Sequence, residues 1–220
     1  MFKKHKIYEL RADSQIEKYR KLLMHTPIAI IDDEGLPKAK MDGLKRHGYK
    51  IEEISDIDQI RQLDAYPIVI SDVDGVANKI DPENQGLGLI RLVAKHYPFK
   101  GLGVYSGKTH SLPILPEDTL VIQKDDEIEK WTEKIDTLIF SVSDPINVWQ
   151  RFAKKLIDSG ISAYDLRKIE NEYVKRILKG ASPDSIKDLK LIQTSPQLKN
   201  VIESLIANGI FLGITKILSV

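Results

Sequence analysis

The stretch PIVISDVDGVANK, from Pro67 to Lys79, decides how the chain folds. Its apolar first half predicts a buried β-strand, and the strand ends abruptly in the segment SDVDG at 71–75. Two carboxylates at the exit of a buried strand are costly unless a cation or a reaction uses them. Two phosphate chemistries fit this pattern. In one, Asp72 accepts a phosphoryl group for signalling. In the other, Asp72 is the nucleophile of a phosphatase and Asp74 is its acid.

Around this strand, apolar runs alternate with segments of helical periodicity. Strands are expected at 28–31, 50–55, 67–72, 101–107 and 119–124, and helices at 36–49, 56–66, 85–98 and 126–140. Such alternation predicts an α/β fold with a parallel sheet that has helices on both faces. The connection between the last two strands carries Pro113 and Pro116. Proline inside a helix costs about 3 kcal/mol, so this connection is expected to form one helical turn at most.

Polar residues stand where the predicted strands end. They are Asp32 and Asp33 after the first strand, Asp72 after the third with Asp74 just beyond it, Ser106 after the fourth and Lys124 after the fifth. The carboxyl ends of parallel strands meet at one edge of the sheet, where ligands bind. Clustered carboxylates repel one another unless a hard cation such as Mg²⁺ (or Mn²⁺) lies among them. A phosphoryl group on Asp72 would be neutralised by that metal, by Lys124 and by the Ser106 hydroxyl group.

These motifs make residues 27–141 resemble a response-regulator receiver domain. The matching segments are the acidic pair Asp32-Asp33, the strand VISD, the helix GLGLIRLV, and the strand ends VYSG and VIQK. The resemblance implies a flavodoxin-like, doubly wound five-stranded parallel sheet in the order 2-1-3-4-5. It implies that Asp72 is the phosphoacceptor, that Asp32, Asp33 and Asp72 bind Mg²⁺, and that Ser106 and Lys124 sense the phosphoryl group. It also implies a sensor histidine kinase or another phosphodonor as a partner in two-component signalling.

The chain departs from the receiver pattern at several places, among them a loop after Asp72 that is longer than usual. Asp125 follows Lys124 where receivers usually have proline, and Val121 stands where they have an aromatic residue that rotates during switching. The fourth helix is degraded by its prolines. A pseudo-receiver, which docks partners without being phosphorylated, therefore remains an alternative. So does a haloacid-dehalogenase-like phosphatase using Asp72 and Asp74, although its further acidic strand would have to be TLIFSVSD at 137–144, which has helical periodicity.

The two ends of the chain show no strand pattern. Residues 1–26 are expected to be an extension with a helix from Ser14 to Met24, and residues 27–144 the receiver-like domain. Residues 145–220 are expected to be a helical output or oligomerisation segment, with helices at 146–160, 162–180, 182–189 and 195–218. This segment has an excess of Lys and Arg, whereas residues 1–144 have an excess of Asp and Glu. Packing on the receiver, a protein partner or self-association is favoured over DNA binding, for which no compact three-helix pattern is present.

Composition sets the remaining expectations. The 220 residues include no Cys, which excludes disulfides and thiolate metal sites, and the net charge of +1 does not favour a nucleic-acid or membrane partner for the whole chain. The N-terminus lacks the apolar region of a signal peptide, and charged residues interrupt the apolar C-terminal helix before it reaches the length of a membrane span. A cytoplasmic protein, not an enzyme in the receiver interpretation, is expected.

Overall fold

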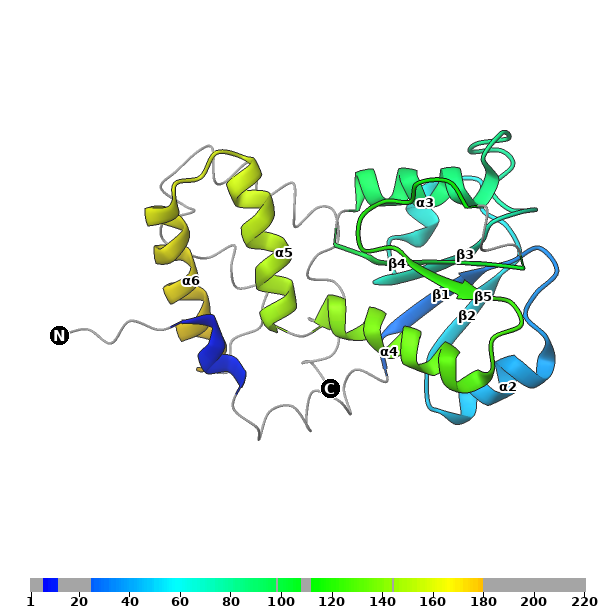
Figure 1. The fold of residues 1–220 in the computed structure, drawn as a ribbon, viewed down its shortest axis with the longest axis horizontal. Helices are drawn as coiled ribbons and strands as arrows, with labels where there is room; N and C mark the ends of the chain where they lie inside the picture. Colours follow the sequence, from blue (N-terminus) through cyan, green and yellow to red (C-terminus); the bar gives the residue numbers. More distant parts are fainter. Residues whose placement is uncertain (1–5, 12–24, 98, 108–111, 144, 180–220) are drawn as a thin grey trace.

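A computed structural model of the chain describes residues 6–11, 25–97, 99–107, 112–143 and 145–179. Within these ranges, a β-sheet carries helices on both faces, and two more helices lie beside this layered part (Figure 1). The helices predicted from Ser14 to Met24, at 182–189 and at 195–218 lie outside the described residues. None of the helices within the described ranges combines the length and apolar character needed to cross a membrane.

The sheet of the described chain has five strands in the order β2-β1-β3-β4-β5. The strands are β1 (Pro27–Ile31), β2 (Lys50–Ile54), β3 (Ile68–Asp72), β4 (Gly101–Ser106) and β5 (Leu120–Gln123). Every neighbouring pair is parallel. The flavodoxin-like α/β fold expected from the sequence is therefore confirmed.

Helices cover the two faces of the sheet in different combinations. Helices α2 (Lys38–Arg46) and α4 (Ile128–Ser143) pack on one face, and α3 (Gln85–His96) packs on the other together with the 3-10 helix η2 (Ile60–Leu63). Neighbouring residues of one strand join different cores, since Ile30 faces α2 and α4 whereas Ile31 faces α3. Both side-chain rows of the central strands are buried, which is why their sequences are continuously apolar.

One predicted helix is wrong. Residues 56–66 form only the short η2, which begins no earlier than Ile60, because Gln59 is its N-cap residue in an extended conformation and forms a capping box with Gln62. The N–H groups of Asp58 and Gln59 both donate to Gln62 Oε1 at 2.9 Å, and that of Ile57 donates to Asp56 Oδ1 at 2.8 Å. The expected loss of the fourth receiver helix is confirmed for residues 112–119, which form neither helix nor strand.

Beyond the sheet, α5 (Pro145–Asp158) and α6 (Ala163–Ile177) form a helical pair, as predicted for 146–160 and 162–180. Trp149 of α5 stacks on Tyr173 of α6 with ring centroids 5.3 Å apart. The N-terminal 3-10 helix η1 (Ile7–Arg11) contacts both helices, and its Ile7 N–H donates to Glu170 Oε1 at 2.9 Å. Helix α5 begins at Pro145, a residue suited to the first helical position, and it contacts α4. The division of the chain into domains at this point stays a prediction.

Candidate functional site

The acidic residues of the predicted site meet at the carboxyl edge of the sheet. Oxygen atoms of Asp32, Asp33 and Asp72 lie within 4.8 Å of one another. Asp32 and Asp72 are buried, with 6% and 4% of their surface exposed, whereas Asp33 is exposed. Asp72 closes β3, and Asp32 directly follows the neighbouring strand β1, so the parallel pairing of these strands brings the two carboxylates together.

Two glycines let the backbone come close to this acidic cluster. Gly75 has φ +84°, and a Cβ atom there would lie 2.5 Å from Asp33 Oδ1. Gly86 lies at the first turn of α3, where a Cβ atom would lie 1.7 Å from the carbonyl oxygen of Asp72. Gly75 is the glycine of the segment SDVDG. Because it has no Cβ atom, it adopts the left-handed turn there and leaves room for the Asp33 carboxylate.

Lys124 forms an ion pair with the predicted phosphoacceptor. Its Nζ donates to Asp72 Oδ2 at 2.5 Å, while Asp72 Oδ1 accepts from the Val73 N–H at 2.7 Å. Burial raises the pKa of the Asp72 carboxyl group, and the hydrogen bond from Lys124 opposes this rise. Burial lowers the pKa of Lys124, but the bond to Asp72 and the charges of Asp72 and Asp32 outweigh it, so the net shift is upward and Lys124 is a cation.

The loop after β5 holds Lys124 from several sides. Lys40 of α2 donates from Nζ to the carbonyl oxygens of Lys124 at 2.5 Å and Asp126 at 2.9 Å. The buried Asp126 carboxylate accepts from the Gln123 N–H at 3.1 Å and is paired with Lys130 and Lys134. These contacts flank Asp125, the residue that stands in place of the usual proline, and they fix the loop by hydrogen bonds instead.

Ser106 and Asp74 occupy different positions relative to the cluster. Ser106 ends β4, is 3% exposed, and its carbonyl oxygen accepts from the Lys124 N–H at 3.1 Å, so the two predicted sensing residues are neighbours. The Asp74 side chain is exposed, and its N–H is 3.5 Å from Asp72 Oδ1. Val121, at the position of the missing switch aromatic, packs against the core on the α3 face of the sheet.

The sequence reasoning missed Tyr105. This residue precedes Ser106 in β4, is fully buried, and donates its hydroxyl hydrogen to Asp32 Oδ2. Strand alternation was the available signal: Tyr105 pairs with Asp72 across β3 and β4, so both point to the same face of the sheet. Burial raises the pKa of the Tyr105 hydroxyl group above its ordinary value, and the hydrogen bond to Asp32 raises it further.

The donor chemistry of this edge fits Mg²⁺. Three carboxylates supply the hard oxygen ligands that Mg²⁺ takes together with waters and phosphate oxygens. Lys124 adds one positive charge beside them, on the Asp72 side of the cluster. An attacking carboxylate, a metal-ligand set and a fixed cation are the elements that phosphoryl transfer requires.

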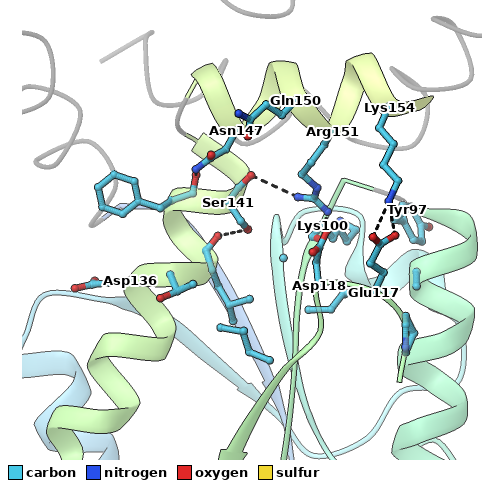
Figure 2. Close-up of a pocket in the computed structure, with 18 of the residues that line it drawn as sticks. Tyr97, Lys100, Glu117, Asp118, Asp136, Ser141, Asn147, Gln150, Arg151 and Lys154 are labelled. Carbon is cyan, nitrogen blue, oxygen red and sulfur yellow. Dashed lines mark hydrogen bonds and ion pairs between the residues drawn. The ribbon is translucent and has the colours of Figure 1, made fainter. Parts of the chain in front are cut away.

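A large pocket in the described residues lies away from the acidic site. It has a volume of about 890 Å³ and is bounded by α5, the end of α4, the start of β4 and residues 116–118 (Figure 2). Arg151 and Lys154 of α5 cross it: Arg151 reaches the backbone near Lys100, and Lys154 pairs with Glu117 at 2.5 Å. The start of β4 is at the opposite edge of the sheet from Asp72, so this pocket is a junction between α5 and the sheet and not the acidic site.

Comparison with known proteins gave one structural match for these observations. No protein-family model matches the chain, and no curated protein matches it. A crystal structure of full-length FixJ from B. japonicum aligns with 84% of this chain and 97% of that chain, at 19% identity and a TM-score of 0.38. Similarity at this level does not establish a common function, which has to come from the site itself. The strand order of residues 27–143 and the helices on both faces of the sheet are those of a flavodoxin-like α/β fold.

Proposed function

We propose that this chain is a response-regulator-like signalling protein that accepts a phosphoryl group on Asp72 with the help of Mg²⁺ or Mn²⁺. The observation that carries the proposal is the surroundings of Asp72. Its carboxylate is almost fully buried and accepts a hydrogen bond from Lys124. One of its oxygen atoms lies within 4.8 Å of oxygen atoms of Asp32 and Asp33, so the three could share a metal ion. Each group alone has an ordinary structural explanation, but their convergence at one strand exit is what a phosphoacceptor needs.

The transfer step follows from these contacts. A carboxylate oxygen of Asp72 attacks the phosphorus of a phosphodonor, such as a phosphohistidine of a sensor kinase or acetyl phosphate. A new P–O bond forms, and the bond to the leaving group breaks with its electron pair. Bound at Asp32, Asp33 and Asp72, Mg²⁺ would neutralise the oxygens of the transferred group. Lys124 has a side chain that is 40% exposed, which gives its ammonium group room to move from Asp72 Oδ2 to a phosphoryl oxygen.

The same contacts suggest how the signal would leave the site. The loop that holds Lys124 leads directly into α4, which contacts α5. A displacement of Lys124 toward a phosphoryl group would pull on the first turn of α4 and so reach residues 145–220. This segment would then engage a protein partner or a second copy of the chain. DNA binding by 145–220 is the less favoured output, and a cytoplasmic location fits the whole scheme.

The phosphatase alternative loses its support in the described residues. It needs a further acidic strand at 137–144, but residues up to Ser143 are helical in α4. A pseudo-receiver differs from the proposal only in chemistry, because it would keep the fold without accepting a phosphoryl group.

One experiment separates these three functions. Purified protein is incubated with Mg²⁺ and acetyl phosphate and followed by intact-mass spectrometry. We expect a gain of about 80 Da, the mass of one phosphoryl group on a nucleophilic carboxylate, in the wild type and in Asp74→Asn. Asp72→Asn should not gain it. A wild type that never gains the mass would establish the pseudo-receiver, and sustained hydrolysis of a phosphomonoester that depends on Asp74 would establish the phosphatase.

A further inference from the structure

Tyr105 connects the acidic cluster to helix α4. Its hydroxyl group donates to Asp32 Oδ2, and its ring meets Trp131 of α4 edge to face, with centroids 5.5 Å apart. The ammonium group of Lys124 lies 5.3 Å from the centre of the same ring. One fully buried side chain therefore contacts a predicted metal ligand, the predicted sensing lysine and the helix that leads to α5.

Two hydrogen bonds fix the Asp32 carboxylate, one from the Tyr105 hydroxyl group and one from the backbone of Glu34. Asp32 Oδ1 accepts from the Glu34 N–H at 3.0 Å, so each carboxylate oxygen has one protein donor. Each oxygen keeps lone-pair capacity beyond that bond. Donors behind a metal-binding carboxylate orient it, and their removal usually weakens metal binding 10- to 100-fold.

We propose that Tyr105 is a positioning residue, which orients Asp32 for the metal and transmits occupancy of the site to Trp131 on α4. This inference rests on the proposed metal-dependent function and adds a residue to it. The link would run on the α4 face of the sheet, whereas Val121 packs on the α3 face. It would thus provide a coupling that does not need an aromatic residue at position 121.

A role in core packing alone makes a different prediction. If Tyr105 only filled space beside Trp131, phenylalanine would replace it without affecting the metal, because the ring would stay and only the hydroxyl group would go. Tyr105→Phe therefore separates the two roles. Tyr49→Phe is the matched control, since Tyr49 is also buried in this core and donates to a carboxylate, Asp136 Oδ1, at 2.8 Å.

The test measures Mg²⁺ affinity of the full chain by titration calorimetry, with Mn²⁺ as a second probe. We expect Tyr105→Phe to bind Mg²⁺ about 10-fold more weakly than the wild type. Tyr49→Phe should lose stability in a similar way but keep wild-type affinity. Equal affinity in Tyr105→Phe and the wild type, or tighter binding by Tyr105→Phe, would overturn the positioning role.

A spectroscopic readout tests the link to α4. Trp131 and Trp149 are the two tryptophans of the chain, so a Trp149→Phe background leaves Trp131 as the reporter. Saturating Mg²⁺ should change Trp131 emission in this background, and adding Tyr105→Phe should abolish the change even at Mg²⁺ concentrations that saturate the variant. An undiminished change would refute the link.

Failure of this inference can be told apart from failure of the proposed function. If the wild type binds neither metal, or if Asp33→Ala binds them as well as the wild type does, the metal site itself is wrong and the role of Tyr105 falls with it. If the wild type binds and Asp33→Ala does not, an unaltered Tyr105→Phe overturns the role of Tyr105 alone.

Discussion

Arg151 is the residue through which the attachment of α5 to the sheet can be tested. Its guanidinium group donates to the carbonyl oxygens of Phe99 and Lys100, both at 3.1 Å, and to that of Ser141 in α4 at 3.5 Å. Phe99 and Lys100 are buried. Replacing Arg151 with methionine would keep much of the side-chain volume but remove these three hydrogen bonds.

The magnitude follows from the two shorter bonds. A hydrogen bond that involves a charged group contributes about 1.5–3 kcal/mol, and burying the guanidinium charge has a cost that the substitution relieves. We expect Arg151→Met to lower the free energy of unfolding by roughly 2–3 kcal/mol, since two buried carbonyl groups lose a donor. Lys154→Met is the matched control on the same helix. It removes the ion pair between Lys154 and Glu117. Both side chains are exposed, and surface ion pairs of this kind contribute little to the free energy of unfolding.

Urea unfolding of the full chain, followed by tryptophan fluorescence, provides the assay. Trp131 reports on α4 and Trp149 on α5, so each is observed in a variant that lacks the other. Arg151→Met should move the Trp149 transition to lower urea concentration than the Trp131 transition, while Lys154→Met should leave both at the wild-type midpoint. Coincident, unshifted transitions in Arg151→Met would refute the inference that this residue fastens α5 to the sheet.

Two further substitutions test how the site is built. Gly75→Ala should weaken Mg²⁺ binding in calorimetry and lower stability by about 1–2 kcal/mol, because φ is positive and the new Cβ atom meets Asp33. Gly107→Ala, which has open space around it, is the control, and equal behaviour of the two variants would contradict this account. Lys40→Met should slow acetyl-phosphate labelling of Asp72 about 10-fold, since it frees the backbone of Lys124, yet leave Mg²⁺ affinity unchanged. An unaltered labelling rate would show that the loop does not need Lys40.

The layered fold could be predicted because its signals are local. Continuous apolar runs such as IVIS mark strands buried on both faces, and each run stops at a polar residue that becomes the strand exit. The predicted helix at 56–66 failed for the opposite reason. Its apolar residues have acceptable helical spacing, but the Gln62 side chain accepts from the N–H groups of Asp58 and Gln59, and this capping box starts the helix only at Ile60. Whether such a side chain points outward or back to the backbone is not encoded in periodicity.

The candidate site could be predicted only in part from the sequence. The ends of strands follow from the local sequence pattern, whereas the contacts between side chains depend on the folded structure. Asp32, Asp33, Asp72, Ser106 and Lys124 follow from the rule that ligands gather at the carboxyl edge of a parallel sheet. Tyr105 and Lys40 do not stand at strand exits. They act through contacts between segments distant in the chain, Tyr105 with Asp32 and Lys40 with Lys124.

Tyr105 and Lys40 offer a structural substitute for the two residues of the receiver pattern that this chain lacks. Read by position, Asp125 and Val121 suggest a loop without its proline and a switch without its aromatic ring. In three dimensions, Lys40 holds the backbone on both sides of Asp125, and the ring of Tyr105 lies between the acidic cluster and Trp131. A loop restraint and an aromatic contact are thus both present, supplied by different residues on the α4 face. A site that can be phosphorylated is therefore compatible with both departures. The departures from the motif do not distinguish a receiver from a pseudo-receiver, whereas phosphoryl labelling of Asp72 does.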